Sequence, residues 1–289
     1  MKRFLLSASL LAAVSLAGAQ VRMVEMPSNA RQKAIDSVVY RITYNAKTID
    51  DTTRTDKEGR YEYAEDMMRL DIGHHTNCFY NYTEMYADSL LRAAYDKSQD
   101  LRGMKHVKST ISWEIYQNYP EGQTTCLDKV WTNKYRITET TQLPQWNIVA
   151  DSTARILGYN CTLATTHYKG RTWRAWFTED IPLPYGPWKL CGLPGLVLRA
   201  ADASRQFIFD AIGLRQMDGT QPILLKKHYD KYEPVSQKMF DKARRETTPG
   251  EAFGAKGVKI GTSNDPELDK AIQNALKKVT PYNPIEVIR

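Results

Sequence analysis

Two segments in the middle of the chain alternate between apolar or aromatic residues and polar ones. Residues 159–168 are rich in Thr, Tyr and Leu, and residues 171–178 carry two Trp and one Phe. β-Branched and aromatic side chains suit the pleated, half-buried surface of a sheet. Lys169 and Gly170 separate the two segments, and glycine readily takes the positive φ of a tight turn. The pattern therefore predicts a β-hairpin.

A two-residue turn also predicts the register of this hairpin. The expected cross-strand pairs are Leu163 with Trp176, Ala164 with Ala175, Thr166 with Trp173, and Thr162 with Phe177. Aromatic and β-branched pairs of this kind contribute roughly 0.2–1 kcal/mol each. Large side chains fall on both faces, so we expect a central hairpin that is covered on each side.

Shorter segments of the same kind lie on either side of the hairpin, separated by turn signals. Short strands joined by such turns are typical of an antiparallel meander or half-barrel, here of about eight to eleven strands. We therefore predict a mainly β fold, a curved antiparallel sheet or half-barrel. The other strand-like segments are residues 37–44, 67–72, 78–82, 110–119, 124–131, 134–140, 146–149, 196–198, 205–213 and 222–227.

Three segments follow a helical period instead. Apolar residues recur at helical spacing over residues 83–100, which predicts a helix that covers the sheet. Ser236 can cap a helix that runs through Arg245. Asp265 and Pro266 start a third helix, since Asp is a good N-cap and Pro suits the first turn.

These elements predict a β domain over residues 20–245 and a separate C-terminal part over residues 246–289. Residues 247–261 are rich in Gly with scattered charge, which predicts a mobile linker. The helix after Asp265 and the tail that follows it would form a helical C-terminal appendage.

The N-terminus has the pattern of a secretory signal peptide. Lys2 and Arg3 precede a short apolar run, which ends in Ala17-Gly18-Ala19. Small residues at positions −3 and −1 are typical of the cleavage site, so we expect cleavage after Ala19. Residues 1–19 are thus predicted to be a signal peptide, and the protein to be periplasmic or secreted.

Charge and motifs exclude several classes of function. The 40 Lys and Arg exceed the 33 Asp and Glu, for a formal net charge of +7. A mild excess spread over the chain is not a nucleic-acid footprint, and no stretch reaches transmembrane length. Nucleophile-elbow, H-E-x-x-H, P-loop and dinucleotide fingerprints are absent from the sequence. We therefore expect no enzymatic activity, no cofactor, no nucleic-acid partner and no transmembrane segment.

Four cysteines fall in the part that export would deliver to an oxidising compartment, where disulfides form. Four cysteines allow three connectivities. We favour Cys78–Cys126 and Cys161–Cys191, because each pair lies within one half of the chain.

A short histidine motif offers a second hypothesis. His74 and His75 follow Gly73, and Cys78 comes three residues later. His and Cys are common metal ligands, but adjacent residues of a strand point to opposite faces. The motif is therefore either a solvated turn or a metal site, and the alternative function is periplasmic metal handling through His74, His75 and Cys78.

A stretch rich in Pro and Gly follows the hairpin. Three prolines within residues 179–188 exclude regular strand pairing there. The stretch is either a structural corner that packs Trp188 and Leu193 into the core, or a loop that binds a ligand or partner from a sheet scaffold. The candidate binding residues are Trp176, Tyr185, Pro187, Trp188, Gly192, Leu193, Pro194 and Gly195.

Several motifs occur here in a characteristic order. They are Gly158-Tyr159-x-Cys161, Ala175-Trp176-Phe177-Thr178 with Ile181-Pro182, Gly186-Pro187-Trp188, and Gly192-Leu193-Pro194-Gly195-Leu196. Together they resemble the GLPGLI family of exported Gram-negative envelope proteins, whose name motif reads GLPGLV here at residues 192–197. The closing residues 282–286 are also similar to the family's C-terminus. The resemblance implies an exported envelope protein, and no catalytic residues can be carried over from it, because the family has no established activity.

The sequence as a whole favours a non-enzymatic binding or accessory protein of the cell envelope. Export, the lack of a catalytic motif, and a corner of Trp, Pro and Gly beside a curved sheet motivate this hypothesis. The expected partner is an apolar small molecule, a peptide, or a component of an outer-membrane transport system. A secreted hydrolase is a third hypothesis, for which no positive feature is present.

Overall fold

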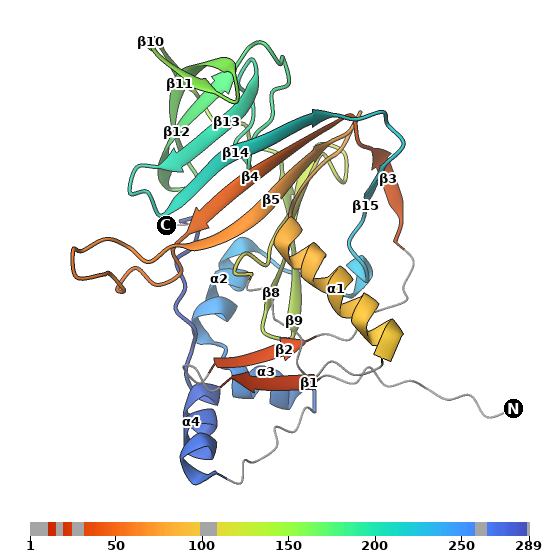
Figure 1. Ribbon diagram of the computed structural model, residues 1–289, viewed down its shortest axis with the longest axis vertical. Coiled ribbons are helices and arrows are strands. Elements are labelled where there is room, and N and C mark those ends of the chain that lie inside the picture. The colour runs from red at the N-terminus through yellow and green to blue at the C-terminus, as the bar shows by residue number, and fades with distance from the viewer. Residues whose placement is uncertain (1–10, 16–19, 25–31, 99–108, 258–264, 288–289) are drawn as a thin grey trace, which may run out of the picture.

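The centre of the protein is a single curved sheet of twelve strands (Figure 1). The computed structural model describes residues 11–15, 20–24, 32–98, 109–257 and 265–287. The predicted cleavage point after Ala19 and residues 258–261 of the predicted linker lie outside these ranges. Within them, no helix is both long and apolar enough to cross a membrane.

The strand order is β10-β11-β12-β13-β14-β4-β5-β6-β7-β8-β9-β16, and the sheet does not close into a barrel. All neighbours pair antiparallel except β9 and β16. The prediction of a mainly β fold is confirmed. The strands are β4 (Tyr40–Thr48), β5 (Ala64–Ile72), β6 (Asn77–Asn81), β7 (Glu114–Gln117), β8 (Gln123–Val130), β9 (Asn133–Thr140), β10 (Asn147–Ile156), β11 (Tyr159–Tyr168), β12 (Arg171–Thr178), β13 (Leu196–Asp202), β14 (Phe207–Gln216) and β16 (Glu233–Pro234).

The described residues also form two smaller sheets of two strands each. One pairs β1 (Leu11–Ser15) with β2 (Gln20–Val24), and the other pairs β3 (Ala34–Ser37) with β15 (Pro222–Leu224). A 3-10 turn, η1 (Tyr229–Lys231), precedes β16.

The central hairpin has the predicted register. Leu163 faces Trp176, Ala164 faces Ala175, Thr166 faces Trp173 and Thr162 faces Phe177. Lys169 and Gly170 have φ values of 51° and 77°, the two positive values that a type I′ turn requires. The hairpin lies within the sheet, since β10 flanks it on one side and β13 on the other, but only β10 separates it from the sheet edge. The prediction that both of its faces are covered is wrong, because Thr172 and Arg174 are exposed on the outer face.

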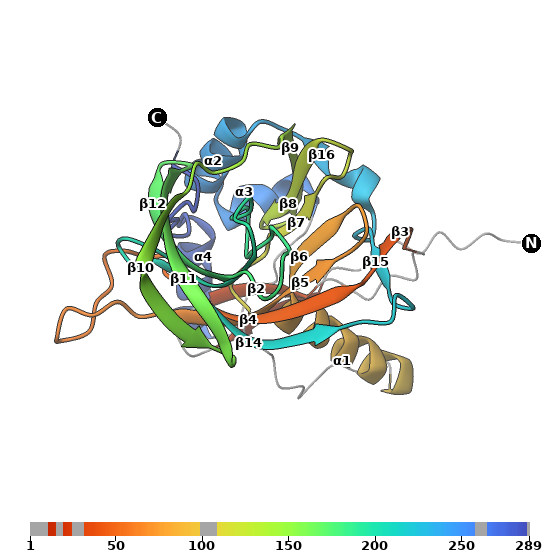
Figure 2. The ribbon, with the colours of Figure 1, turned by 90° about the horizontal axis from the view of Figure 1, so that it is seen from above.

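The stretch rich in Pro and Gly lies inside the curve of the sheet (Figure 2). Trp188 is 1% exposed and packs against Trp173, with ring centroids 5.2 Å apart, and against Tyr168 at 5.7 Å. Leu193 is also 1% exposed and belongs to the same core cluster. Burying side chains of this size contributes roughly 1.5–3 kcal/mol each, so this stretch is a structural part of the core.

The three predicted helices are confirmed. α1 (Tyr82–Ser98) lies against β5, α2 (Gln237–Glu246) is capped by Ser236, and α4 (Pro266–Leu276) by Asp265.

The prediction of a linker over residues 247–261 is wrong in its first half, where α3 (Pro249–Ala255) forms. Thr248 and Glu251 cap α3 reciprocally in a capping box.

After α4 the chain returns to the sheet (Figure 1) and docks on the turn of the central hairpin. The Arg171 guanidinium donates to the side-chain oxygen of Asn283 (2.8 Å) and the carbonyl of Pro284 (2.6 Å). The backbone N–H of Val287 donates to the carbonyl of Lys169 (2.9 Å). The tail is therefore held by the hairpin over residues 283–287.

All four cysteines are free thiols, so the structure does not contain the predicted pairs Cys78–Cys126 and Cys161–Cys191. Cys78 stands opposite Tyr116 of β7, whereas Cys126 stands opposite Ile115 of β7. Because consecutive residues of a strand point to opposite faces, Cys78 and Cys126 lie on opposite faces of the sheet. The predicted pairing relied on proximity in the sequence, which does not show which face of the sheet each cysteine occupies.

Candidate functional site

Half of the eight predicted binding residues are buried. Trp188, Leu193, Pro187 and Gly195 are buried. A Cβ atom on Gly195 would lie 1.9 Å from the carbonyl oxygen of Thr178, so glycine is required there for close packing of two backbones.

The remaining corner residues are closer to the surface. Gly192 and Pro194 are exposed, and the half-buried Tyr185 is tied to β13 because its carbonyl accepts from the N–H of Val197 (3.0 Å). These residues do not line the surface hollow that contains Trp176. The structure therefore separates Trp176 from the rest of the predicted set.

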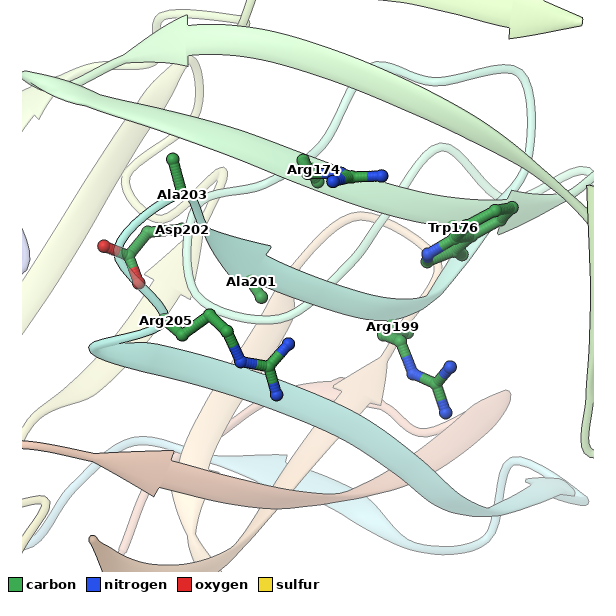
Figure 3. A pocket seen from close by; sticks show the side chains of 7 residues that line it. All are labelled: Arg174, Trp176, Arg199, Ala201, Asp202, Ala203 and Arg205. Carbon is green, nitrogen blue, oxygen red and sulfur yellow. The ribbon is translucent and has the colours of Figure 1, made fainter. Parts of the chain in front are cut away.

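Trp176 lies half-buried on the outer face of β12, beside a hollow of about 320 Å³ (Figure 3). We call this site the arginine hollow. Its lining residues are Arg174, Trp176, Arg199, Ala201, Asp202, Ala203 and Arg205. They come from β12, from β13 and from the turn between β13 and β14.

The hollow exists because short and long side chains stand next to each other on the outer face. Arg174 of β12 pairs with Ala201 of β13, and Trp176 pairs with Arg199. The methyl group of Ala201 leaves the space between the long side chains of Arg174 and Arg205 unfilled, as Figure 3 shows. The hollow lies over β12 and β13 and is partly open to solvent.

The arginine hollow is positively charged, since its lining contains three arginines and one acidic residue. The Arg199 guanidinium forms a salt bridge with Asp210 of β14. Neither Arg174 nor Arg205 takes part in a salt bridge within the described part of the chain, and both are exposed.

Asp202, the acidic residue in the lining, is already neutralised from the other side. Its carboxylate pairs with the Arg171 guanidinium at 2.9 Å, and its side chain is only 2% exposed. Burial lowers the pKa of Arg171, against the effect of Asp202, which acts to raise it. The hollow therefore presents two uncompensated guanidinium groups beside an indole ring.

The sequence analysis identified Trp176 but missed the arginines. Alternation along β12 places Arg174 and Trp176 on one face, and this could be inferred from the sequence alone. The pairing of β12 with β13 could not be inferred from the sequence, because 17 residues separate the two strands and the register shifts between Trp176 and Phe177.

The histidine motif is an exposed turn. His74 and His75 are exposed, and the N–H of His75 donates to the Asp36 carboxylate (2.7 Å). Cys78 is buried in the next strand, where its thiol faces Glu114 at 3.8 Å. No group of three or more His, Cys, Asp or Glu among the described residues could hold a metal ion. The structure therefore does not bring His74, His75 and Cys78 together as ligands.

The thiol of Cys78 is shielded rather than activated. Burial, with Glu114 and Asp71 nearby, raises the pKa of Cys78 well above its ordinary value. A thiol with a raised pKa is a poor nucleophile and a poor metal ligand at neutral pH.

Comparison with known proteins finds a family that is similar to one segment of the chain. A family model described as a protein of unknown function, Porph_ging, matches residues 164–199, which include Arg174, Trp176 and Arg199. No curated protein matches the chain.

Two solved structures of PNGF-II, in the P21 and C2 space groups, are similar to it at 15% and 16% identity, with TM-scores of 0.45 and 0.44. They cover 71% and 70% of this chain, which spans only 33% and 32% of theirs. Over residues 164–199 the chain is thus similar to a family of unknown function.

Proposed function

We propose that this chain is an exported, non-enzymatic binding protein of the GLPGLI family, and that the arginine hollow binds an acidic peptide segment of an envelope partner. One observation carries the proposal: Arg174 and Arg205, which form no salt bridge with a described residue, line a hollow that also exposes Trp176. The family motifs and the signal-peptide pattern support the envelope location.

Guanidinium chemistry favours a carboxylate. The planar fork of Arg matches a carboxylate in a bidentate way. Exposed pairs contribute only roughly 0.2–1 kcal/mol each, so Arg174 and Arg205 alone give weak binding. Contact of an apolar side chain with Trp176 would add the burial that useful affinity requires.

The spread of the arginines favours a peptide over a small anion. Neighbouring strands lie about 4.8 Å apart, and carboxylates at alternate positions of an extended peptide lie about 6.7 Å apart. Such a peptide can reach the arginines of β12 and of the turn after β13 at once. An inorganic anion is too small to engage the same groups together.

The inner side of the sheet is a poorer binding position for an apolar ligand, because the buried side chains of Trp188 and Leu193 fill the corner there. The outer face therefore offers the better docking position for a partner.

Fluorescence anisotropy with a labelled peptide of alternating Glu residues and one central Phe tests the proposal. We expect Arg174→Gln and Arg205→Gln each to weaken binding several-fold, and raised salt to weaken it further because the contacts are exposed. Lys238→Gln, on the exposed face of α2, is the matched control and leaves binding unchanged.

Two results contradict the proposal. One is equal binding of the counterpart peptide in which Gln replaces every Glu. The other is displacement of the peptide by millimolar inorganic phosphate, which would mean that the hollow selects small anions rather than peptides.

A further inference from the structure

The turn between β13 and β14 presents Arg205 to the arginine hollow (Figure 3). Arg205 has a φ of 56°, in the left-handed region that residues with a Cβ atom seldom adopt. Asp202 closes the turn, because its carbonyl accepts from the N–H of Arg205 (2.9 Å) and its carboxylate accepts from the N–H of Phe207 (2.8 Å). Such a backbone persists only where the surrounding structure holds it. The contacts of this turn with other segments therefore determine how firmly Arg205 is placed.

Two of these contacts come from the sheet and its loops. The hydroxyl of Tyr63, in the loop before β5, donates to the carbonyl of Arg205 (2.7 Å). The Arg171 guanidinium donates to the carboxylate of Asp202 (2.9 Å) and to the side-chain oxygen of Gln206 (3.1 Å). The turn is thus held at its first residue, at Arg205 itself and at the residue that follows Arg205.

The C-terminal tail provides a third contact with the turn. The side-chain amide of Asn283 donates to the same oxygen of Gln206 (3.2 Å) and to the carbonyl of Ile49 (2.8 Å). The side-chain oxygen of Asn283 accepts from Arg171 (2.8 Å). Asn283 therefore joins the tail to the turn twice, directly through Gln206 and indirectly through Arg171.

The tail occupies a site that fits it closely. Glu286 pairs with the buried Lys189 and lies 3.5 Å from Lys169. A Cβ atom on Gly170 would overlap the carbonyl oxygen of Val287, so the hairpin turn leaves room for the tail backbone only because residue 170 is glycine. The docked tail is therefore a defined state of the chain, in which Asn283 has a fixed position beside the turn.

We propose that docking of the tail regulates peptide binding at the arginine hollow, because the docked tail holds the turn in the conformation that presents Arg205. This inference rests on the proposed function of the hollow. With the tail docked, Arg205 is already in place when a peptide arrives, and a preorganised group loses less freedom on binding. With the tail undocked, Gln206 loses its bond to Asn283, and Arg171 loses its acceptors in the tail.

The effect is reciprocal. If a docked tail strengthens peptide binding by some factor, a bound peptide strengthens docking of the tail by the same factor. A purely structural role of the tail would not produce this second effect, so it distinguishes regulation from general stabilisation.

Amide hydrogen exchange of the full chain, followed by NMR, tests the link without a peptide. The N–H groups of Arg205 and Phe207 are protected by their bonds to Asp202. We expect Asn283→Ala to speed the exchange of both several-fold, because the turn opens more often. Asn45→Ala is the matched control, since it removes a side-chain hydrogen bond to Glu65 (3.1 Å) on neighbouring strands, and it should leave this exchange unchanged.

Fluorescence anisotropy with the labelled peptide of Glu residues and one Phe tests the regulation. Asn283→Ala should weaken binding several-fold, although Asn283 does not line the hollow. Gln206→Ala should also weaken binding, and the double variant should weaken it by less than the product of the two factors, because both changes remove the same bond.

The reciprocal effect is measured at the tail. The N–H of Val287 donates to the carbonyl of Lys169 (2.9 Å), so its exchange reports undocking. Peptide added to the wild-type chain should slow this exchange, whereas the counterpart peptide with Gln in place of every Glu should not.

Three results would overturn the regulation and leave the proposed function standing. They are wild-type peptide affinity in Asn283→Ala, unchanged exchange of Arg205 and Phe207 in that variant, and exchange of Val287 that bound peptide does not slow. Failure of the wild-type chain to bind the peptide is a different outcome. It would reject the proposed function itself, and the regulation with it.

Discussion

The buried ammonium group of Lys189 offers the sharpest test of how the protein is held together. Lys189 precedes the Leu190-Cys191-Gly192 part of the corner, and its side chain is 4% exposed. Its Nζ lies 2.6 Å from a carboxylate oxygen of Glu139 on β9 and also pairs with Glu286 of the C-terminal tail. Glu286 is 6% exposed. One cation thus joins the corner, a strand and the tail.

The substitution Lys189→Met keeps the length and removes the charge. Breaking a buried pair by removing one partner costs about 3–5 kcal/mol, because the other charge stays buried. Lys169 remains within 2.6 Å of Glu139 and 3.5 Å of Glu286 and compensates in part, so we expect the lower end of that range. A loss of about 3 kcal/mol corresponds to a fall in Tm of roughly 6–12 °C for a domain of this size.

Urea unfolding followed by tryptophan fluorescence measures this loss. Lys47→Met is the matched control, since Lys47 and Glu65 form a pair at 3.1 Å with side chains 35% and 52% exposed. Such an exposed pair contributes at most about 1 kcal/mol. The double variant Lys189→Met/Glu286→Leu removes the stranded charge as well, and should be more stable than Lys189→Met alone by about 1 kcal/mol or more.

The pH dependence of stability gives a second readout. Burial acts to raise the pKa of Glu139, but Lys189 and Lys169 outweigh it and hold the pKa below the ordinary value of 4.5. A carboxyl whose folded pKa is lowered contributes stability above its unfolded pKa and loses it as the pH falls through the folded pKa. The difference between wild type and Lys189→Met should therefore be full at pH 7 and shrink well below pH 4.5. A cost below about 1 kcal/mol, equal to that of the exposed control, would refute the reasoning.

The remaining predictions concern backbone packing and capping. Gly195→Ala should unfold the corner or cost more than about 3 kcal/mol, because the new Cβ would lie 1.9 Å from the Thr178 carbonyl oxygen. Gly254→Ala, whose Cβ would meet nothing within 4 Å, is its control and should change stability by less than about 1 kcal/mol in thermal melts. Thr248→Ala removes the N-cap of α3 and should cost about 1 kcal/mol, and Thr248→Ser should retain most of that stability. Equal losses for the Ala and Ser variants would contradict the capping interpretation.

Features that depend on neighbouring residues could be predicted from the sequence. The register of the central hairpin followed from a two-residue turn and from alternation, because turn geometry determines which residues face each other. The starts of α2 and α4 followed from Ser236 and Asp265, since an N-cap acts on the first turn of its own helix. The signal for α3 was also present, as Thr248 and Glu251 have the spacing of a capping box, but the nearby glycines had indicated a linker.

The candidate site could not be predicted in the same way. The arginine hollow depends on the pairing of β12 with β13 across the long corner, on a shift in their register, and on the turn that brings Arg205 beside Arg174. The location of Cys78 and Cys126 on opposite faces of the sheet likewise depends on the pairing of β6, β7 and β8. Each requires knowledge of contacts between segments far apart in the chain.

The sequence by itself determined the β class, the central hairpin and its register, and the caps of two helices, because these follow from periodicity and turn chemistry within a few residues. Only the tertiary structure decided that the Trp188 corner fills the inner side of the sheet, that the tail docks on Arg171 and Lys189, and that Trp176 faces outward among arginines. The physical reason is that burial, ion pairing and surface exposure depend on contacts between segments that are far apart in the sequence.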